Sequence, residues 1–294
     1  MAPDRKTVPA PVSEFALYRL NRAGTTLSSV CRRSFDSVAY SRYKYGSASA
    51  ADGYARELWL AFLARHRELA HLGRLLVAAS PYYRVPTAAN AVAVKFAAML
   101  SAERAECGLP AARMVRIRRM AVPAGDYGQL PMTERTRLMA GNVLSVDRLR
   151  PCADGAHLIV VDDVKVTGEH QRCLRRASDS LSLGSRTFVH IAMFDDEGTG
   201  ELDPVIEDRL NHCAVKTLDD LAAIAASADF TWNVRVCKFL LTPANRAGLG
   251  QFLAGMPNRF IEELCRNSVA DGYARMDAYR ESYQIAVQVL RREF

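Results

Sequence analysis

The sequence predicts an α/β protein in which helices cover both faces of a parallel sheet. Short apolar runs alternate along the chain with helix-like stretches of ten or more residues, as expected when right-handed crossovers join parallel strands. The clearest of these runs, 75–79 and 157–161, are almost wholly aliphatic and predict buried strands. A chain of 294 residues with 49% hydrophobic side chains is long enough to build such a core.

The first half of the chain contains three predicted kinds of segment. Residues 1 to about 30 show no regular period and are expected to form an N-terminal arm. Apolar side chains recur at helical spacing over 47–70, which predicts an amphipathic helix. The strand at 75–79 is followed by an Ala-rich helix at 87–107. Residues 114–120 alternate apolar side chains with arginines, which indicates a strand with one exposed face.

The second half begins with a polar stretch marked by Gly and Pro at 122–142, which we predict to be a long loop. The elements after it continue the alternation of strands and helices. In chain order they are a strand at 157–161, a helix at about 168–181, a strand at 187–194, helices around 203–213 and 218–228, a strand-like run at 231–241, and a helical tail from 246 to 294.

Charge and cysteine usage narrow the class of protein. The formal net charge is +7, which suits either a phosphate-binding or nucleic-acid-binding surface or a simple compositional bias. The chain contains no helix-turn-helix and no basic-aromatic RNA motif, so nucleic acid is a disfavoured partner. Its seven cysteines stand singly, which argues against a disulfide framework or a zinc site and favours a reducing cytoplasm. No apolar targeting or membrane-spanning segment is expected.

The most informative segment is 157–170. Its apolar strand ends in Asp162 and Asp163, and a short loop with Thr167 and Gly168 then opens a helix. In open α/β sheets, ligands bind at the carboxyl ends of the strands. Backbone N–H groups at such a helix start can bind phosphate, and the carboxylates can accept hydrogen bonds from sugar hydroxyls or hold Mg²⁺ through water. A phosphorylated sugar with neighbouring hydroxyls would use both parts of this segment, the phosphate-binding helix start and the carboxylates. A P-loop NTPase is disfavoured because the chain has no Gly-x-x-x-x-Gly-Lys-Ser/Thr.

This segment resembles the phosphoribosyl-pyrophosphate (PRPP) signature of type I phosphoribosyltransferases, which have a Rossmann-like sheet and a helical hood. The resemblance implies that Asp162 and Asp163 contact the ribose hydroxyls and act in catalysis, with Mg²⁺ held by them through water. It also implies a 5′-phosphate loop made of consecutive residues. That loop consists of Val166, Thr167, Gly168, Glu169 and His170.

Two positions of the loop depart from the family pattern. Val166 stands where many purine-using members have an aspartate that can act as a base toward the acceptor, and His170 stands where the loop commonly ends in threonine. The His170 side chain can still donate a hydrogen bond to phosphate. The resemblance therefore favours binding of PRPP but disfavours a role in purine salvage.

The same resemblance implies two further parts of the site. A loop after the first core strand would bind pyrophosphate, with Arg84 as the charged partner and Ser80 and Tyr83 beside it. The stretch 122–142 would be a lid that closes over the pyrophosphate. Its candidate contact residues are Tyr127, Arg135 and Arg137.

Taken together, the resemblance implies three regions: an N-terminal arm with a helical hood element (1–69), a phosphoribosyltransferase core (70–241) and a C-terminal helical hood or tail (242–294). The expected activity is Mg²⁺-dependent transfer of the 5-phosphoribosyl group from PRPP to an unidentified small-molecule acceptor, with release of pyrophosphate. The alternative is a non-catalytic regulator or sensor that binds PRPP or a nucleotide. The resemblance extends to uncharacterised bacterial members, and a homodimer is the oligomer to consider.

Overall fold

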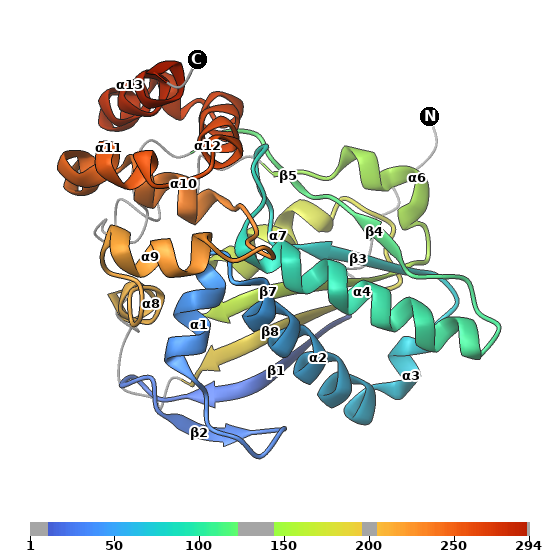
Figure 1. Ribbon diagram of the computed structural model, residues 1–294. Helices are drawn as coiled ribbons and strands as arrows, with labels where there is room; N and C mark the ends of the chain where they lie inside the picture. Colours follow the sequence, from blue (N-terminus) through green and yellow to red (C-terminus); the bar gives the residue numbers. More distant parts are fainter. Residues whose placement is uncertain (1–10, 123–143, 196–204, 293–294) are drawn as a thin grey trace.

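The computed structural model describes residues 11–122, 144–195 and 205–292 (Figure 1). Its central feature is a six-stranded sheet in the order β2-β1-β8-β7-β3-β4. All neighbouring pairs are parallel except β1 and β2, which are antiparallel. The strands are β1 (Val12–Leu20), β2 (Thr26–Ser29), β3 (Leu75–Ala79), β4 (Arg113–Val115), β7 (His157–Lys165) and β8 (Ser185–Phe194). The α/β class with a largely parallel sheet flanked by helices is confirmed.

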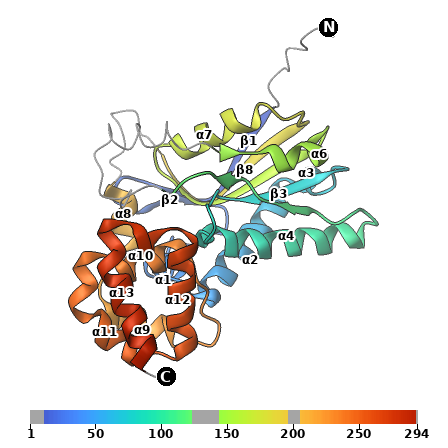
Figure 2. The same ribbon diagram turned by 90° about the horizontal axis from the view of Figure 1, so that it is seen from above.

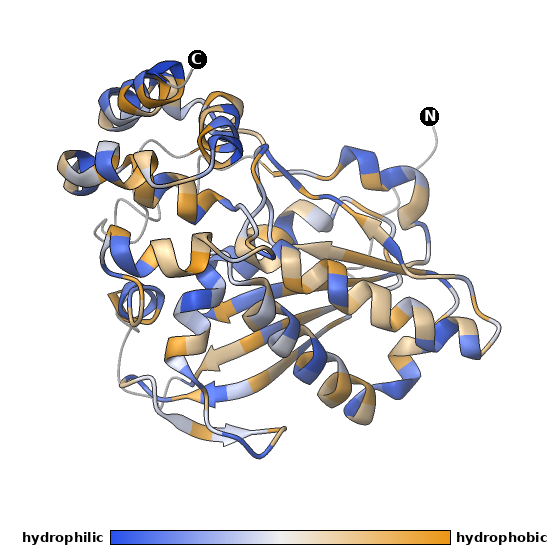
Figure 3. Ribbon diagram, in the orientation of Figure 1, coloured by the Kyte–Doolittle hydropathy of each residue, from blue (hydrophilic) through white to orange (hydrophobic). Residues whose placement is uncertain are grey.

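Helices cover the two faces of this sheet (Figure 2). One face packs against α2 (Ala48–Arg65) and α4 (Ala88–Glu106), and the other packs against α6 (Arg150–Ala153) and α7 (Glu169–Ser178). Successive residues of β3 and β7 enter opposite cores because side chains alternate along a strand. Both faces of these strands are therefore apolar over 75–79 and 158–161, where consecutive residues are hydrophobic (Figure 3).

A separate group of helices packs on its own hydrophobic core beyond one end of the sheet. We call this group, α9 to α13, the helical cluster; it lies past the tips of the strand arrows in Figure 1. Its members are α9 (Leu218–Ala225), α10 (Val234–Leu241), α11 (Arg246–Ala254), α12 (Asn258–Ala270) and α13 (Asp277–Arg292). The remaining helices are α1 (Ser37–Lys44), α3 (Arg67–Ala70) and α8 (Val205–Asn211). The helical tail is thus confirmed as three helices joined by short turns.

The expectation that residues 1 to about 30 form an arm is wrong for the described part of that segment. Strand β1 pairs with β8 from Val12 to Leu20 and lies inside the sheet. Polar residues hide its strand pattern, and each has a partner: Ser13 with Thr187, Glu14 with Lys165 and Arg19 with Asp195. The segment therefore belongs to the core of the fold, although the division of the chain at 70 and 242 stays a prediction.

The strand predicted at 231–241 is also wrong, because most of it, from Val234 to Leu241, is helix α10. The Asn233 side chain accepts hydrogen bonds from the N–H groups of Arg235 and Val236 and so caps the helix. A short apolar run cannot distinguish a buried strand from a buried helix by periodicity. The strand predicted at 114–120 is divided: β4 joins the main sheet, while β5 (Arg118–Arg119) pairs with β6 (Leu144–Ser145).

Candidate active site

A cavity of about 410 Å³ lies between the carboxyl ends of the strands and the helical cluster. From the sheet side it is lined by Asp162, Asp163 and His170, and from α10 by Arg235 and Lys238. Both acidic residues of the predicted motif and one residue of the predicted phosphate loop therefore meet in a single space. Figures 1 and 2 show the helical cluster covering this end of the sheet.

The uneven lengths of neighbouring strands bring the acidic pair to this cavity. Strand β3 pairs with β7 as far as Val161, whereas β8 pairs with β7 as far as Lys165. Asp162 and Asp163 thus lie within β7, just past the end of β3. Because side chains alternate, Asp163 faces the side where α1 lies and Asp162 faces the side where α7 begins.

Asp163 forms a buried ion pair with Lys44, the last residue of α1. The side chains are only 8% (Lys44) and 12% (Asp163) exposed. Burial by itself raises the pKa of Asp163, but the charge and hydrogen bond of Lys44 outweigh it and hold that pKa below its usual range. Asp163 is therefore a fixed negative charge with its own counter-charge.

Asp162 lies in a different environment. Its Oδ1 accepts the N–H of Asp163 at 2.9 Å, and its Oδ2 lies 3.8 Å from His170 Nε2. Burial and the neighbouring Asp163 charge raise the pKa of Asp162 to about 7. The two adjacent carboxylates thus differ in protonation behaviour near neutral pH, one ionised and the other able to bind or release a proton.

His170 connects the acidic pair to the loop after β3. Its Nε2 lies 3.0 Å from Ser80 Oγ, within hydrogen-bond distance. Burial, together with the Arg119 charge, lowers the pKa of His170 to about 3. The imidazole is therefore neutral at physiological pH and offers one donor and one acceptor nitrogen.

The predicted phosphate loop begins helix α7 with a left-handed residue. Gly168 has φ of +72°, and a Cβ at this position would lie 3.1 Å from Lys165 Cε. The Thr167 hydroxyl accepts the N–H of Glu169 at 3.4 Å, and Arg172 donates to the Thr167 carbonyl. Of the five predicted loop residues, His170 is the one that lines the cavity, while Val166 packs against the hydrophobic core.

Glu14 of β1 accepts hydrogen bonds from residues at both ends of the predicted phosphate loop. Its Oε2 accepts from Lys165 Nζ at 2.7 Å, just before the loop, and its Oε1 accepts from the Gln171 amide, just after it. Burial raises the pKa of Glu14, yet these two hydrogen bonds and the Lys165 charge bring it below its usual value. The strand that the sequence left unassigned thus positions the ends of the most informative motif.

Glu14→Gln should loosen this loop. The substitution removes the charge that both partners contact, and hydrogen bonds to a charged group contribute about 1.5–3 kcal/mol, so amide hydrogen exchange over 166–170 should accelerate about tenfold or more. Asp195→Asn, which weakens the Arg19 contact on the same strand, is the matched control and should leave the loop unchanged. Equal exchange over 166–170 in Glu14→Gln and the unsubstituted protein would contradict the role given to Glu14.

In the loop after β3, Ser80 and Arg84 were both predicted to lie at the pyrophosphate, but Arg84 does not line the cavity. Ser80 lines the cavity, but the Arg84 side chain is exposed and lies over the Tyr83 ring, with its Cζ 5.4 Å from the ring centroid. The N–H groups of Arg84 and Val85 both donate to Asp271 at 3.0 Å, which fixes this loop to the helical cluster. The pyrophosphate role of Arg84 and Tyr83 stays a prediction.

Several residues that line the cavity were not found from the sequence, and Arg119 and Lys44 are two of them. Arg119 reaches the cavity from β5, which is held against the loop after β3 by the hydrogen bond from Arg119 N–H to the Tyr82 carbonyl at 3.0 Å. Lys44 comes from α1, far away in sequence. The only available signals were an arginine in an alternating stretch and a lysine in a Tyr-rich one. The predicted lid contacts, Tyr127, Arg135 and Arg137, lie outside the described residues.

The acidic pair can be tested as a Mg²⁺ site. Carboxylate oxygens are ligands that Mg²⁺ prefers, but Asp163 already holds Lys44, and each carboxylate accepts one backbone N–H. Within the described ranges, no group of three potential protein ligands gathers at this cavity. The pair therefore fits an ion held mainly by substrate phosphates and water, rather than one enclosed by protein ligands.

A parallel sheet that brings an acidic strand and a glycine-opened helix to one covered cavity defines a protein of the phosphoribosyltransferase class. The family model described as "PRTase ComF-like", where PRTase denotes phosphoribosyltransferase, matches residues 14–286, and the chain belongs to that family. The match runs from β1 to α13 and so includes the helical cluster. No curated protein matches the sequence. In the described part of the chain, every helix is too short or too polar to span a membrane.

Proposed function

We propose that this protein transfers the 5-phosphoribosyl group of PRPP to a small-molecule acceptor and releases pyrophosphate. The observation that carries the proposal is the convergence of Asp162, Asp163 and the start of α7 on one cavity. The carboxylates would accept hydrogen bonds from the ribose hydroxyls, and the N–H groups of the loop would bind the 5′-phosphate. Arg119 and Ser80, which line the same cavity, lie on the side of the predicted pyrophosphate loop.

The chemical step breaks the bond between C1′ and the pyrophosphate oxygen, and the electron pair leaves with pyrophosphate. The acceptor then forms its bond to C1′ while the ribose carries positive charge. Fixed negative charge near the sugar, supplied by Asp163, stabilises that charge, and Arg119 stabilises the charge that develops on pyrophosphate. Val166 leaves the loop without a carboxylate base, so the acceptor proton must be taken by another group or lost from the acceptor itself.

Mg²⁺ belongs to the same proposal. Asp162 and Asp163 would hold it through water, and it would neutralise charge on the leaving pyrophosphate. The other contacts would come from the chain itself: the N–H groups at the start of α7 would bind the 5′-phosphate, and Arg119 would bind the pyrophosphate. The helical cluster over the cavity would exclude water that could hydrolyse the donor.

The second candidate is a PRPP-binding regulator without turnover. The observation that favours it is the Lys44–Asp163 ion pair, because it already neutralises one of the two carboxylates that would face the sugar. Both candidates require PRPP binding at the same residues. They differ in whether pyrophosphate is released.

Release of pyrophosphate from PRPP, in the presence of Mg²⁺ and fractionated small molecules from cell extract, separates the two. The transferase predicts acceptor-dependent release that falls at least about 100-fold in the double variant Asp162→Asn, Asp163→Asn, since preorganised charges of this kind contribute about 10²–10³ in rate. Asp147→Asn, on an exposed turn away from the cavity, should keep full activity. Tight PRPP binding without release in every fraction would favour the regulator, and absence of binding would exclude both.

A further inference from the structure

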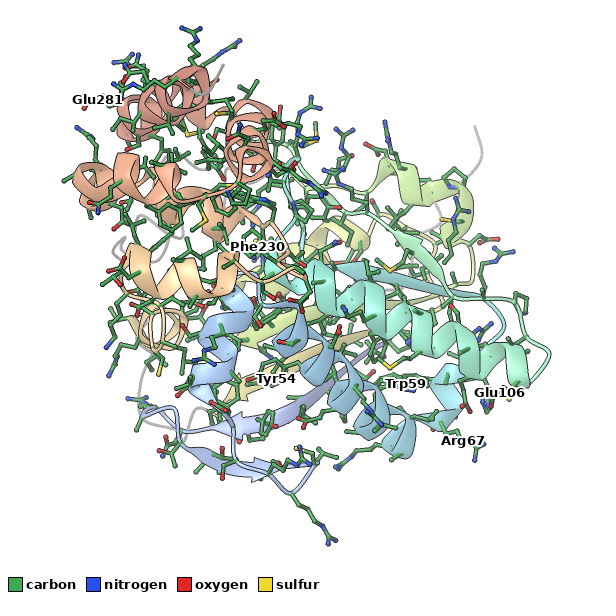
Figure 4. All side chains as sticks on the ribbon, in the orientation of Figure 1. Tyr54, Trp59, Arg67, Glu106, Phe230 and Glu281 are labelled. Carbon is green, nitrogen blue, oxygen red and sulfur yellow. The ribbon has the colours of Figure 1, made fainter. Side chains whose placement is uncertain are left out.

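A second cluster of potential ligands lies at the opposite end of the sheet. His71 follows α3 and leads toward the amino end of β3, while Glu103 and Cys107 stand in and just after the last turns of α4. In Figure 4 the labelled Arg67 and Glu106 mark this end of the molecule, far from the helical cluster. We propose that His71, Glu103 and Cys107 bind one thiophilic divalent cation of the Zn²⁺ type, independently of the proposed transferase function.

Two of the three distances between the ligand atoms match tetrahedral zinc coordination. His71 Nε2 lies 3.5 Å from Glu103 Oε1 and 3.6 Å from Cys107 Sγ, and all three atoms are within 4.8 Å of one another. Zinc bonds of about 2.0–2.3 Å at tetrahedral angles put neighbouring ligand atoms about 3.3–3.8 Å apart. Two of the three separations therefore already have the values that a bound ion requires.

Helix geometry and a buried arginine hold the ligands in place. Cys107 is the C-cap residue of α4 and follows Glu103 by four positions, so both side chains lie on the same side of this helix end. Between them, Arg104 is fully buried and donates to the carbonyls of Ala70 and Gly73, on either side of His71. Arg104 also donates to the carbonyls of Leu72 and Pro110. The segments that carry His71 and Cys107 are thus joined before any ion binds.

The types of the three ligand atoms, nitrogen, oxygen and sulfur, indicate which ion would bind. A thiolate, an imidazole and a carboxylate suit Zn²⁺ and Co²⁺, whereas Mg²⁺ and Ca²⁺ prefer oxygen ligands alone. Cys107 is the exposed one of the seven cysteines, and its thiol proton is released to solvent when the sulfur binds the ion. The nearest competing cation is Arg67, whose Nη2 lies 3.9 Å from Glu103 Oε1 on a side chain that is 73% exposed and free to move aside. Three protein ligands leave a fourth tetrahedral position for water.

From the sequence, a zinc site was disfavoured because no two of the seven cysteines are close together along the chain. That argument considers ligands that are close together along the chain. Here His71 and Cys107 are 36 residues apart and meet only because α3 and α4 pack at the same end of the sheet. Such a site has no local motif by which the sequence could reveal it.

Titration of the reduced, metal-free protein with Co²⁺ tests the proposal. We expect saturation at one equivalent, with visible bands of tetrahedral cobalt and a near-ultraviolet thiolate-to-cobalt band, and displacement by Zn²⁺. Cys107→Ser should abolish the thiolate band, and His71→Gln should weaken Co²⁺ binding by at least about 100-fold, because loss of outer-shell partners alone costs about 10–100-fold. Cys265→Ser, on a half-buried cysteine of α12, is the matched control and should bind like the parent.

The thiolate band keeps this test separate from the cavity, because ions bound by Asp162 and Asp163 give no sulfur-to-metal absorption. Circular dichroism of each variant checks that the fold is retained. Failure of the parent protein to bind one equivalent with a thiolate band would overturn the proposal, as would an undiminished band in Cys107→Ser. Neither result would bear on PRPP binding.

Discussion

Lys44→Met should lower the free energy of unfolding by about 3–5 kcal/mol at neutral pH, because removing one partner of a buried ion pair leaves the other charge uncompensated. Asp163, left without Lys44, would still lie beside Asp162 with little of its side chain exposed. Urea denaturation measures the change. A loss below about 1 kcal/mol would show that the pair behaves like an exposed one.

The pH dependence gives this prediction a second test. The pKa of Asp163 is lowered in the folded state, so the pair stabilises the fold above the unfolded pKa of about 3.9, and this stabilisation disappears as pH falls through the folded pKa. In Lys44→Met, burial raises the pKa of Asp163 instead. The difference between the two proteins should therefore shrink steadily as the solution is acidified.

Two variants separate charge from packing. Lys44→Met combined with Asp163→Asn should recover most of the lost stability, because no buried charge then lacks a partner. Lys95→Met breaks the ion pair with Asp52, whose side chains are 37% and 56% exposed, and should cost less than about 1 kcal/mol. If the double variant were as unstable as Lys44→Met, the effect would come from packing around Lys44 rather than from charge.

Arg104→Met should be the most destabilising change outside the cavity. Arg104 is fully buried, and its guanidinium donates to four main-chain carbonyls at 2.6–2.9 Å, those of Ala70, Leu72, Gly73 and Pro110. Methionine fills a similar volume but donates no hydrogen bond, and a carbonyl left unsatisfied in the interior, as that of the buried Ala70 would be, costs about 1–3 kcal/mol. We expect a loss of at least about 3 kcal/mol in urea denaturation.

Arg104→Lys should recover only part of this stability, because a single ammonium cannot reproduce the planar fork that serves four acceptors. Arg74→Met is the control, since Arg74 is exposed and donates to one carbonyl, that of Asp154. Its effect should stay within about 0.5 kcal/mol, as for surface substitutions generally. Equal stability of Arg104→Met and Arg74→Met would contradict the structural role assigned to Arg104.

The elements that were predicted correctly are those whose structure follows from a local sequence pattern. The buried strand at 75–79 is wholly apolar, and the helix at 87–107 combines alanines with a glycine stop. Strand β1 was missed because the residues that satisfy its polar side chains, Thr187, Lys165 and Asp195, are far along the chain. Helix α10 was predicted as part of a strand because the periodicity of a short apolar run does not separate strand from helix, and its cap, Asn233, fell inside that run.

The same distinction applies to the site. The acidic pair and the Thr-Gly turn are consecutive in the chain, so their chemistry could be inferred from the sequence. Lys44 is separated from Asp163 by 119 positions and Glu14 from Gln171 by 157, and only the folded sheet brings these partners together. Long-range contacts of this kind leave no local pattern, and for that reason the protonation states of the site could not be predicted.

The central claim is that one cavity binds PRPP through Asp162, Asp163 and the loop that opens α7. Calorimetric titration of the intact chain with PRPP and Mg²⁺ tests it most directly. We predict one PRPP per chain, competition by both ribose 5-phosphate and pyrophosphate, and an affinity at least about 100-fold lower in the double variant Asp162→Asn, Asp163→Asn, since each lost hydrogen bond to a charged group costs about 1.5–3 kcal/mol. Equal affinity of the double variant and the parent protein would contradict the claim.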